Sequence, residues 1–225
     1  MRYIGNKENI LENIYSILQS NNVSGKTFFD FFAGTTNVGR FFKSKKYQIF
    51  SSDILYLSYC LQKAYIENNE EPKFENLINN LPKQNSENLF QNPLEIVESY
   101  LTSLEGVEGF IYKNYTPSGT KELQQPRMYF IDENGKKIDA IRQQIENWKN
   151  EDLISESEYF ILLTCLIETI GFYSNIAGVY AAFHKHWDFR ALRPLELRTI
   201  QFVDNGKKNI VYNDDSMNLL DKIDV

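Results

Sequence analysis

Apolar and polar residues alternate over the first 70 positions in an order that predicts a parallel sheet. Apolar residues recur at helical spacing across residues 8–20, which predicts an amphipathic helix. Two short apolar runs, at residues 27–32 and 47–52, predict strands, and helical patterns follow them at residues 37–44 and 54–68. Strands that alternate with helices favour parallel pairing through right-handed crossovers. The first part of the chain is therefore expected to have an α/β fold.

This alternation stops near residue 69, where a polar segment rich in Asn, Lys and Glu begins. Further along, the pattern predicts helices at residues 94–104, 138–149 and 156–173, a loop at residues 105–126, and a third strand at residues 209–212. We therefore place a mainly helical insertion at residues 70–205, between the second and third strands. Residues 1–69 and 206–225 would form the core domain.

Composition limits the class of protein. Hydrophobic residues make up 42% of the chain, charged residues 24%, and no apolar run approaches the length of about 20 residues that a membrane helix needs. The two cysteines, Cys60 and Cys165, stand far apart, which indicates reduced thiols in a cytoplasmic protein. His184 and His186 have no cysteine nearby, so no metal site is expected. The net charge of −6 argues against non-specific coating of nucleic acid but permits local basic patches.

The strongest candidate for a binding site is the sequence FFDFFAGTTNVG at residues 28–39. Asp30 would end the first strand, and residues 33–36 would form a turn tight enough for backbone N–H groups to approach a ligand. Such a turn suits a nucleotide-sized cofactor. A plain buried strand followed by a turn has nearly the same pattern, so this stretch alone leaves both interpretations open.

Two further acids follow predicted strands. Asp53 comes after the second strand, where a carboxylate can accept hydrogen bonds from ribose hydroxyls; it is also suited to cap the next helix. Asp214 follows the third strand, where it could accept a hydrogen bond from an adenine amine or cap a helix at residues 216–222. Both interpretations remain open for each residue.

Four motifs in order, RYIGNK, DFFAGTTNVG, SSDI and NDDSMNLL, resemble those of Dam-type (alpha-group) DNA adenine-N6 methyltransferases. The resemblance implies a Rossmann-like class I methyltransferase sheet, of which this chain would hold the first three core strands. It also implies that S-adenosylmethionine binds at the glycine loop, with Tyr3 and Lys7 at its methionine end, Asp53 at the ribose and Asp214 at the adenine. The residues of the loop that would wrap the cofactor are Asp30, Phe32, Ala33, Gly34 and Thr35.

The sequence departs from the family pattern at two places. Thr35 and Thr36 stand where the family commonly has glycines, and no two prolines are adjacent, so the Pro-Pro-containing catalytic tetrapeptide is absent. The strand at residues 27–32 would lack its family neighbour and form an unpaired edge. We expect cofactor binding without turnover, with the missing part supplied by a second polypeptide, lost by gene interruption or removed by shortening of the chain.

By the same resemblance, the insertion would recognise double-stranded DNA. Polar, aromatic and basic groups in two segments suit contacts to phosphates and base edges: Lys113, Tyr115, Ser118, Arg127, Lys185 and Arg190. A solvated basic face is the competing interpretation, and Trp187 and Phe189 would then pack the insertion onto the core.

The leading hypothesis is the cofactor-binding and target-recognition part of an adenine-N6 methyltransferase in a restriction–modification system. A non-catalytic DNA-binding module that retains the fold is the alternative. A nicotinamide-dependent enzyme is disfavoured because the loop lacks the third glycine of the dinucleotide fingerprint.

Overall fold

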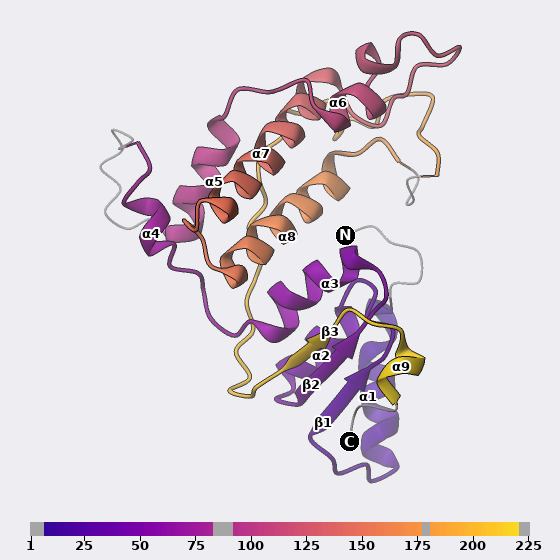
Figure 1. Cartoon of the computed structure of the whole chain (residues 1–225). Helices are drawn as coiled ribbons and strands as arrows, with labels where there is room; N and C mark the ends of the chain where they lie inside the picture. Colours follow the sequence, from indigo (N-terminus) through magenta and orange to yellow (C-terminus); the bar gives the residue numbers. More distant parts are fainter. Residues whose placement is uncertain (1–6, 83–91, 177–180, 221–225) are drawn as a thin grey trace. The chain divides into compact units, whose positions relative to one another are not determined.

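The structure, a computed structural model, describes residues 7–82, 92–176 and 181–220 (Figure 1). The described chain divides into two compact units. Residues 7–71 and 201–220 form a sheet unit, and residues 72–200 form a helical unit.

Three parallel strands form the sheet: β1 (Thr27–Asp30), β2 (Gln48–Ser52) and β3 (Ile210–Tyr212), in the order β1-β2-β3 (Figure 1). Thr27 lies opposite Gln48, and Phe50 lies opposite Ile210. With its many helices, this parallel sheet confirms the predicted α/β class. Among the described residues β1 pairs only with β2, so β1 is an edge strand.

Strand β1 ends two residues earlier than predicted, because the chain turns toward β2 directly after Asp30. The backbone N–H of Ala33 donates to the Ser52 carbonyl oxygen at 3.0 Å. The Ser52 hydroxyl in turn donates to the Phe31 carbonyl oxygen at 3.0 Å. The apolar run thus continues past the strand into a turn that is bonded to the end of β2.

Helices α2 (Asn37–Ser44), α3 (Tyr56–Gln62) and its π-helical continuation η2 (Lys63–Glu67) pack on this sheet. The sheet unit also contains a short 3-10 helix η1 (Glu8–Ile10), α1 (Leu11–Ser20) and α9 (Ser216–Leu220). The ring of Phe28 stacks on that of Phe42 with centroids 4.0 Å apart, which fixes α2 on β1. A Cβ on Gly39 would lie 2.9 Å from Ile66 Cδ1, so glycine allows α2 and η2 to approach closely.

A buried lysine also connects α2 to η2. Lys43 is fully buried, and its Nζ donates to the carbonyl oxygens of Tyr65 at 3.0 Å and Asn68 at 2.5 Å. Carbonyl groups at the end of a helix lack partners within that helix, and the ammonium group supplies donors to them. Burial lowers the pKa of Lys43 to about 8; Asp204 opposes this shift and Arg40 adds to it.

We expect the wild type to gain stability over K43M as pH rises above about 8. The folded-state pKa lies below the ordinary value of 10.5, so in this window the unfolded chain binds the extra proton and deprotonation favours folding. The gain should be about 1 kcal/mol over the first pH unit. Urea unfolding of both proteins from about pH 7 to 10 measures it. A difference between the two proteins that does not change with pH would contradict this role for Lys43.

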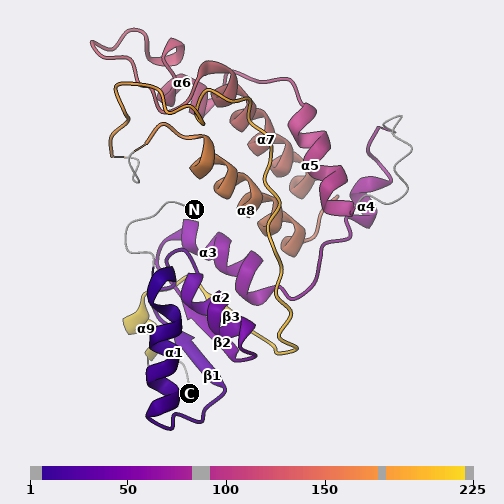
Figure 2. The ribbon, with the colours of Figure 1, turned by 180° about the vertical axis from the view of Figure 1, so that it is seen from behind.

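The helical unit contains α4 (Glu75–Ile78), α5 (Pro93–Ser103), α6 (Phe110–Tyr115), the 3-10 helix η3 (Ser118–Thr120), α7 (Asp132–Asn150) and α8 (Glu156–Tyr173). Figures 1 and 2 show α7 and α8 lying side by side, with α5 next to α7. Ser155 and Glu158 form a capping box that starts α8 where the sequence predicts it. Helix α7 begins six residues earlier than predicted, at Asp132 rather than 138.

The prediction of a loop at residues 105–126 is wrong, because α6 and η3 lie within this segment. The donor groups at the start of α6 are satisfied by a distant residue. Asp139 of α7 accepts the N–H of Ile111 on Oδ1 at 2.9 Å and the N–H of Tyr112 on Oδ2 at 2.8 Å. This cap lies 28 positions along the chain from Ile111, so no local signal reveals it.

Candidate functional site

The parallel sheet brings three acids to one edge. Asp30 is the last residue of β1, Asp53 follows β2 directly, and Asp214 lies two residues beyond β3. Because all three strands run in the same direction, their carboxyl ends meet at the same edge, where open α/β sheets bind ligands.

The turn after β1 follows its path with threonines at residues 35 and 36, where the resemblance implies glycines. Gly34 and Thr36 have left-handed backbones, with φ of 52° and 65°. A left-handed threonine costs about 1 kcal/mol, but Thr36 is fully buried and its backbone N–H donates to the Ala33 carbonyl oxygen at 2.7 Å. Surrounding contacts therefore hold a conformation that threonine disfavours.

Asp53 joins this turn to the end of β2. Its Oδ2 accepts the Gly34 N–H and its Oδ1 accepts the Leu55 N–H, both at 2.9 Å. Helix α3 starts at Tyr56 with Leu55 as its N-cap, so Asp53 does not cap that helix. A carboxylate can accept about four hydrogen bonds, so each oxygen retains capacity for a ligand hydroxyl.

Asp30 has a buried oxygen without a partner. Its Oδ2 is inaccessible to solvent and accepts no hydrogen bond from the described residues. Burial raises the pKa of the Asp30 carboxyl, while the charge of Lys7 and the N–H groups of Phe32 and Gly39 lower it. A buried carboxylate oxygen without a donor is costly, and it calls for a donor from a ligand, a water molecule or the residues outside the described part of the chain.

Two roles were open for Asp214, as an acceptor for an adenine amine or as the cap of the next helix, and the loop after β3 assigns the cap. Asp215 caps α9, because its Oδ1 accepts the Met217 N–H at 2.9 Å. Asp214 instead accepts the Asp215 N–H at 2.8 Å and the Asn218 amide at 3.1 Å on Oδ1. The helix cap predicted as the alternative role of Asp214 thus belongs to its neighbour.

Three exposed apolar side chains follow the strand ends: Phe32 at 73%, Ile54 at 68% and Met217 at 70% exposure. Sequence reasoning missed Ile54 and Met217, although an apolar residue just past a strand-ending acid is a usable signal. It also missed Asn213, whose side-chain amide donates to the carbonyl oxygens of Asp53 at 2.9 Å and Ile54 at 3.1 Å. Asn213 thereby joins the loops that follow β2 and β3.

Of the predicted cofactor contacts, the structure brings Asp30, Phe32, Ala33, Gly34, Thr35, Asp53 and Asp214 to this edge. Lys7 is exposed and acts electrostatically on Asp30. Tyr3 lies outside the described residues.

The predicted DNA contacts lie on two segments of the helical unit. Lys113 is an exposed residue of α6, and Tyr115 packs edge-on to Tyr129 with ring centroids 5.4 Å apart. The Ser118 hydroxyl donates to Asp132, and Arg127 donates from Nη1 to the Asn114 carbonyl oxygen at 2.9 Å. These four residues stay predictions, and Ser118 and Arg127 already have intramolecular partners.

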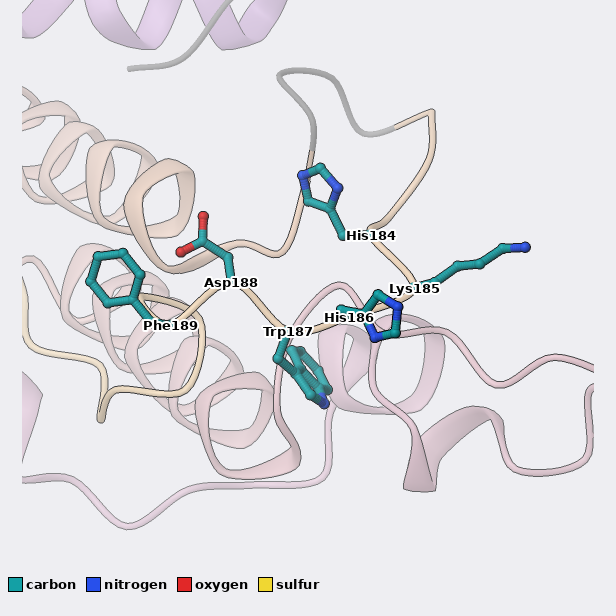
Figure 3. Close-up of a pocket in the computed structure, with 6 residues that line it drawn as sticks. All are labelled: His184, Lys185, His186, Trp187, Asp188 and Phe189. Atoms are coloured by element: carbon teal, nitrogen blue, oxygen red, sulfur yellow. The ribbon is translucent and has the colours of Figure 1, made fainter.

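The second segment, residues 184–189, lines a surface hollow of about 560 Å³ (Figure 3). Its side chains spread apart, with Phe189 and Lys185 extending in opposite directions (Figure 3). Arg190 forms an ion pair with Asp188, at 2.5 Å from Nη2 to Oδ2. Lys185 is exposed to solvent, and both basic residues stay predicted DNA contacts.

The described residues include no group of three or more His, Cys, Asp or Glu placed to hold a metal ion. No helix in the described part of the chain has the length and apolarity to cross a membrane.

A family model for D12 class N6 adenine-specific DNA methyltransferases matches residues 3–225. The chain belongs to this family. Among curated members it is 42% identical over 224 residues to the type II methyltransferase M.FokI of Planomicrobium okeanokoites, covering 99% of this chain and 32% of M.FokI. It is 40% identical to the modification methylase StsI of Streptococcus sanguinis, over 99% of this chain and 32% of StsI.

M.NlaIII of Neisseria lactamica, a type II methyltransferase, is 38% identical over 99% of this chain and 61% of its own length. This D12 methyltransferase chain therefore spans about a third of M.FokI and StsI and less than two thirds of M.NlaIII. No solved structure gives a significant match. The match confirms the resemblance drawn from the four motifs.

Proposed function

We propose that this chain is the cofactor-binding and target-recognition part of a site-specific DNA adenine-N6 methyltransferase of a restriction–modification system. The sheet unit would bind S-adenosylmethionine, as the first three strands of a Rossmann-like class I methyltransferase sheet. The helical unit, within the predicted insertion at residues 70–205, would recognise double-stranded DNA. The observation that carries the cofactor assignment is the buried Oδ2 of Asp30, which lies at the carboxyl edge of the sheet and has no partner among the described residues.

The donors and acceptors at this edge fit the parts of S-adenosylmethionine. The cofactor carries an ammonium group, which would supply the missing donor to Asp30, and a carboxylate, which suits Lys7. Asp53 has acceptor capacity for the two ribose hydroxyls. Phe32, Ile54 and Met217 offer exposed apolar surface for the adenine, beside Asp214 as acceptor for its amine.

S-adenosylmethionine supplies the methyl group for transfer to adenine N6. The described residues would bind and orient this cofactor. The Gly34–Asp53 hydrogen bond fixes the turn after β1 against the loop after β2 before any ligand arrives. A site whose geometry is already fixed loses less conformational freedom on binding, which favours affinity.

The names of the relatives support the biological setting: M.FokI and M.NlaIII are type II methyltransferases and StsI is a modification methylase. M.FokI and StsI also extend well beyond the matched region. The Pro-Pro tetrapeptide implied by the resemblance is not among these 225 residues. We assign the positioning of the target adenine to sequence outside them, in the same or a second polypeptide.

We expect the 225-residue chain to bind S-adenosylmethionine but to transfer no methyl group to DNA by itself. The physical reason is that an adenine amine needs acceptor and stacking groups to be held for attack. Incubation with methyl-labelled cofactor and unmethylated genomic DNA, followed by counting of label in the DNA, measures this. Label incorporated by the chain alone would overturn the assignment of adenine positioning to other sequence.

The alternative is a non-catalytic DNA-binding module. Such a module would not need to bind a cofactor at the carboxyl edge of the sheet. A chain that binds DNA but not S-adenosylmethionine would favour that alternative.

A further inference from the structure

Three arginines and two phenylalanines alternate on the surface of the helical unit, in the order Arg193, Phe189, Arg190, Phe172 and Arg198. We call them the Arg–Phe ladder. The guanidinium carbons of Arg193 and Arg190 lie 5.4 and 5.8 Å from the ring centroid of Phe189. Those of Arg190 and Arg198 lie 5.8 and 4.2 Å from the centroid of Phe172. These distances are typical of cation–π contacts.

Buried polar side chains hold the backbone beneath the ladder. Asn134 of α7 donates from Nδ2 to the Arg193 carbonyl oxygen at 2.9 Å, and its Oδ1 accepts the Leu195 N–H at 3.0 Å. Thr169 of α8 accepts the Arg198 N–H on Oγ1 at 2.9 Å. Asn134 and Thr169 are both buried. The ladder is therefore presented on a backbone that two long helices fix in advance, as binding sites require.

The ladder also has positive charge that the described part of the unit does not neutralise. Arg190 is paired with Asp188. Arg193 and Arg198 are exposed, and neither forms an ion pair within the described residues. A guanidinium group stacked on a ring still directs its N–H groups outward, where they suit phosphate oxygens.

Phe189 is 66% exposed although it lies between two arginines. An exposed ring costs free energy in water, and its exposed surface is suited to contact with another planar group. Nucleic acid is the class of ligand that combines phosphates with planar bases. A base inside an intact duplex cannot offer its face, whereas a base that has left the stack can.

We propose that the Arg–Phe ladder is a DNA contact in which Phe189 stacks on a base that has left the duplex stack, while Arg193 and Arg198 contact the neighbouring phosphates. This rests on the proposed function, since it takes DNA as the substrate of the helical unit. Adenine-N6 methylation in a duplex requires the target base to leave the stack, so such a surface would stabilise the opened DNA.

The test compares two labelled probes by fluorescence anisotropy: a mixed-sequence duplex of about 30 base pairs and the same duplex with one unpaired adenine. We expect the full chain to prefer the duplex with the unpaired base. F189A should reduce that preference roughly 10-fold, whereas F189W should retain it. Because Phe189 is exposed, F189A should melt at the wild-type temperature, which separates a lost contact from a lost fold.

Loss of the arginines should change DNA binding in a different way from loss of Phe189. The R193Q/R198Q double variant should weaken binding to both probes alike and reduce the slope of log affinity against log salt by about 2. K73Q is the control for charge: Lys73 belongs to the same unit, its side chain is 75% exposed, and it is not part of the ladder.

The proposal is overturned if F189A keeps the wild-type preference for the unpaired base, or if the wild type has none. It is also overturned if K73Q lowers the salt slope as much as the double variant. These results would leave the proposed function standing as long as the chain binds DNA and S-adenosylmethionine. A chain that binds the cofactor but no DNA would overturn both the ladder and the assignment of DNA recognition.

Discussion

D30N is expected to weaken S-adenosylmethionine binding about 10- to 100-fold, the range for loss of a charge-assisted hydrogen bond at a buried site. The substitution keeps the shape of the side chain but removes the negative charge of the carboxylate, whose Oδ2 has no donor among the described residues. Equilibrium dialysis with labelled cofactor measures the loss. Because burial raises the pKa of Asp30, the wild-type affinity should also fall as the pH is lowered through that pKa, and D30N should not show this fall.

D215N is the matched control for this experiment. It removes one negative charge from the same edge of the sheet, and asparagine caps helices about as well as aspartate, so α9 should persist. We expect D215N to bind with nearly the wild-type affinity. Equal losses in the two variants would show a general effect of charge, and wild-type affinity in D30N would exclude Asp30 as the acceptor.

G119A is expected to destabilise the helical unit by about 3 kcal/mol, more than most surface substitutions. A Cβ at Gly119 would overlap the Tyr112 carbonyl oxygen and lie 2.8 Å from Lys113 Cα. These atoms belong to the backbone of α6, so no rotation of a side chain relieves the overlap. The start of α6 is in turn bonded to Asp139, which prevents the helix from moving away.

Gly25 is the control glycine, since a Cβ there meets no atom within 4 Å. G25A should be neutral or slightly stabilising because alanine restricts the unfolded chain. Thermal unfolding followed by far-ultraviolet circular dichroism compares the two variants with the wild type. A melting temperature in G119A equal to that of G25A would show that α6 does not pack against Gly119 as described.

The sheet unit was largely predictable because its signals are local. The apolar runs, the glycine turn and the acids at residues 30 and 53 lie where a parallel strand meets its loop, and β1, β2 and α2 formed close to the predicted ranges. What the pattern could not give was the exact end of β1. That end depends on bonds between the turn and Ser52, which is distant in sequence.

The helical unit was less predictable because distant residues decide its local structure. The cap that Asp139 provides to α6, and the close approach of Gly119 to Tyr112, join segments that no periodicity connects. Distant residues also decide whether its predicted DNA contacts are available. Ser118 looks like an available hydroxyl in the sequence, but its partner Asp132 lies 14 positions away.

The glycine loop at residues 28–39 stays a predicted nucleotide site, and two features of the structure bear on the ligand that we propose for it. Asp53 accepts the Gly34 N–H of the turn, and the Oδ2 of Asp30 has no donor among the described residues. Both features suit a cofactor with an ammonium group and ribose hydroxyls.

Isothermal titration of the 225-residue chain with S-adenosylmethionine, S-adenosylhomocysteine and NAD tests the assignment of this edge most directly. We expect saturable binding of one molecule of either S-adenosyl compound per chain and no binding of NAD. Absence of binding by both S-adenosyl compounds, or saturable binding of NAD, would contradict the assignment of the edge of β1, β2 and β3 to S-adenosylmethionine.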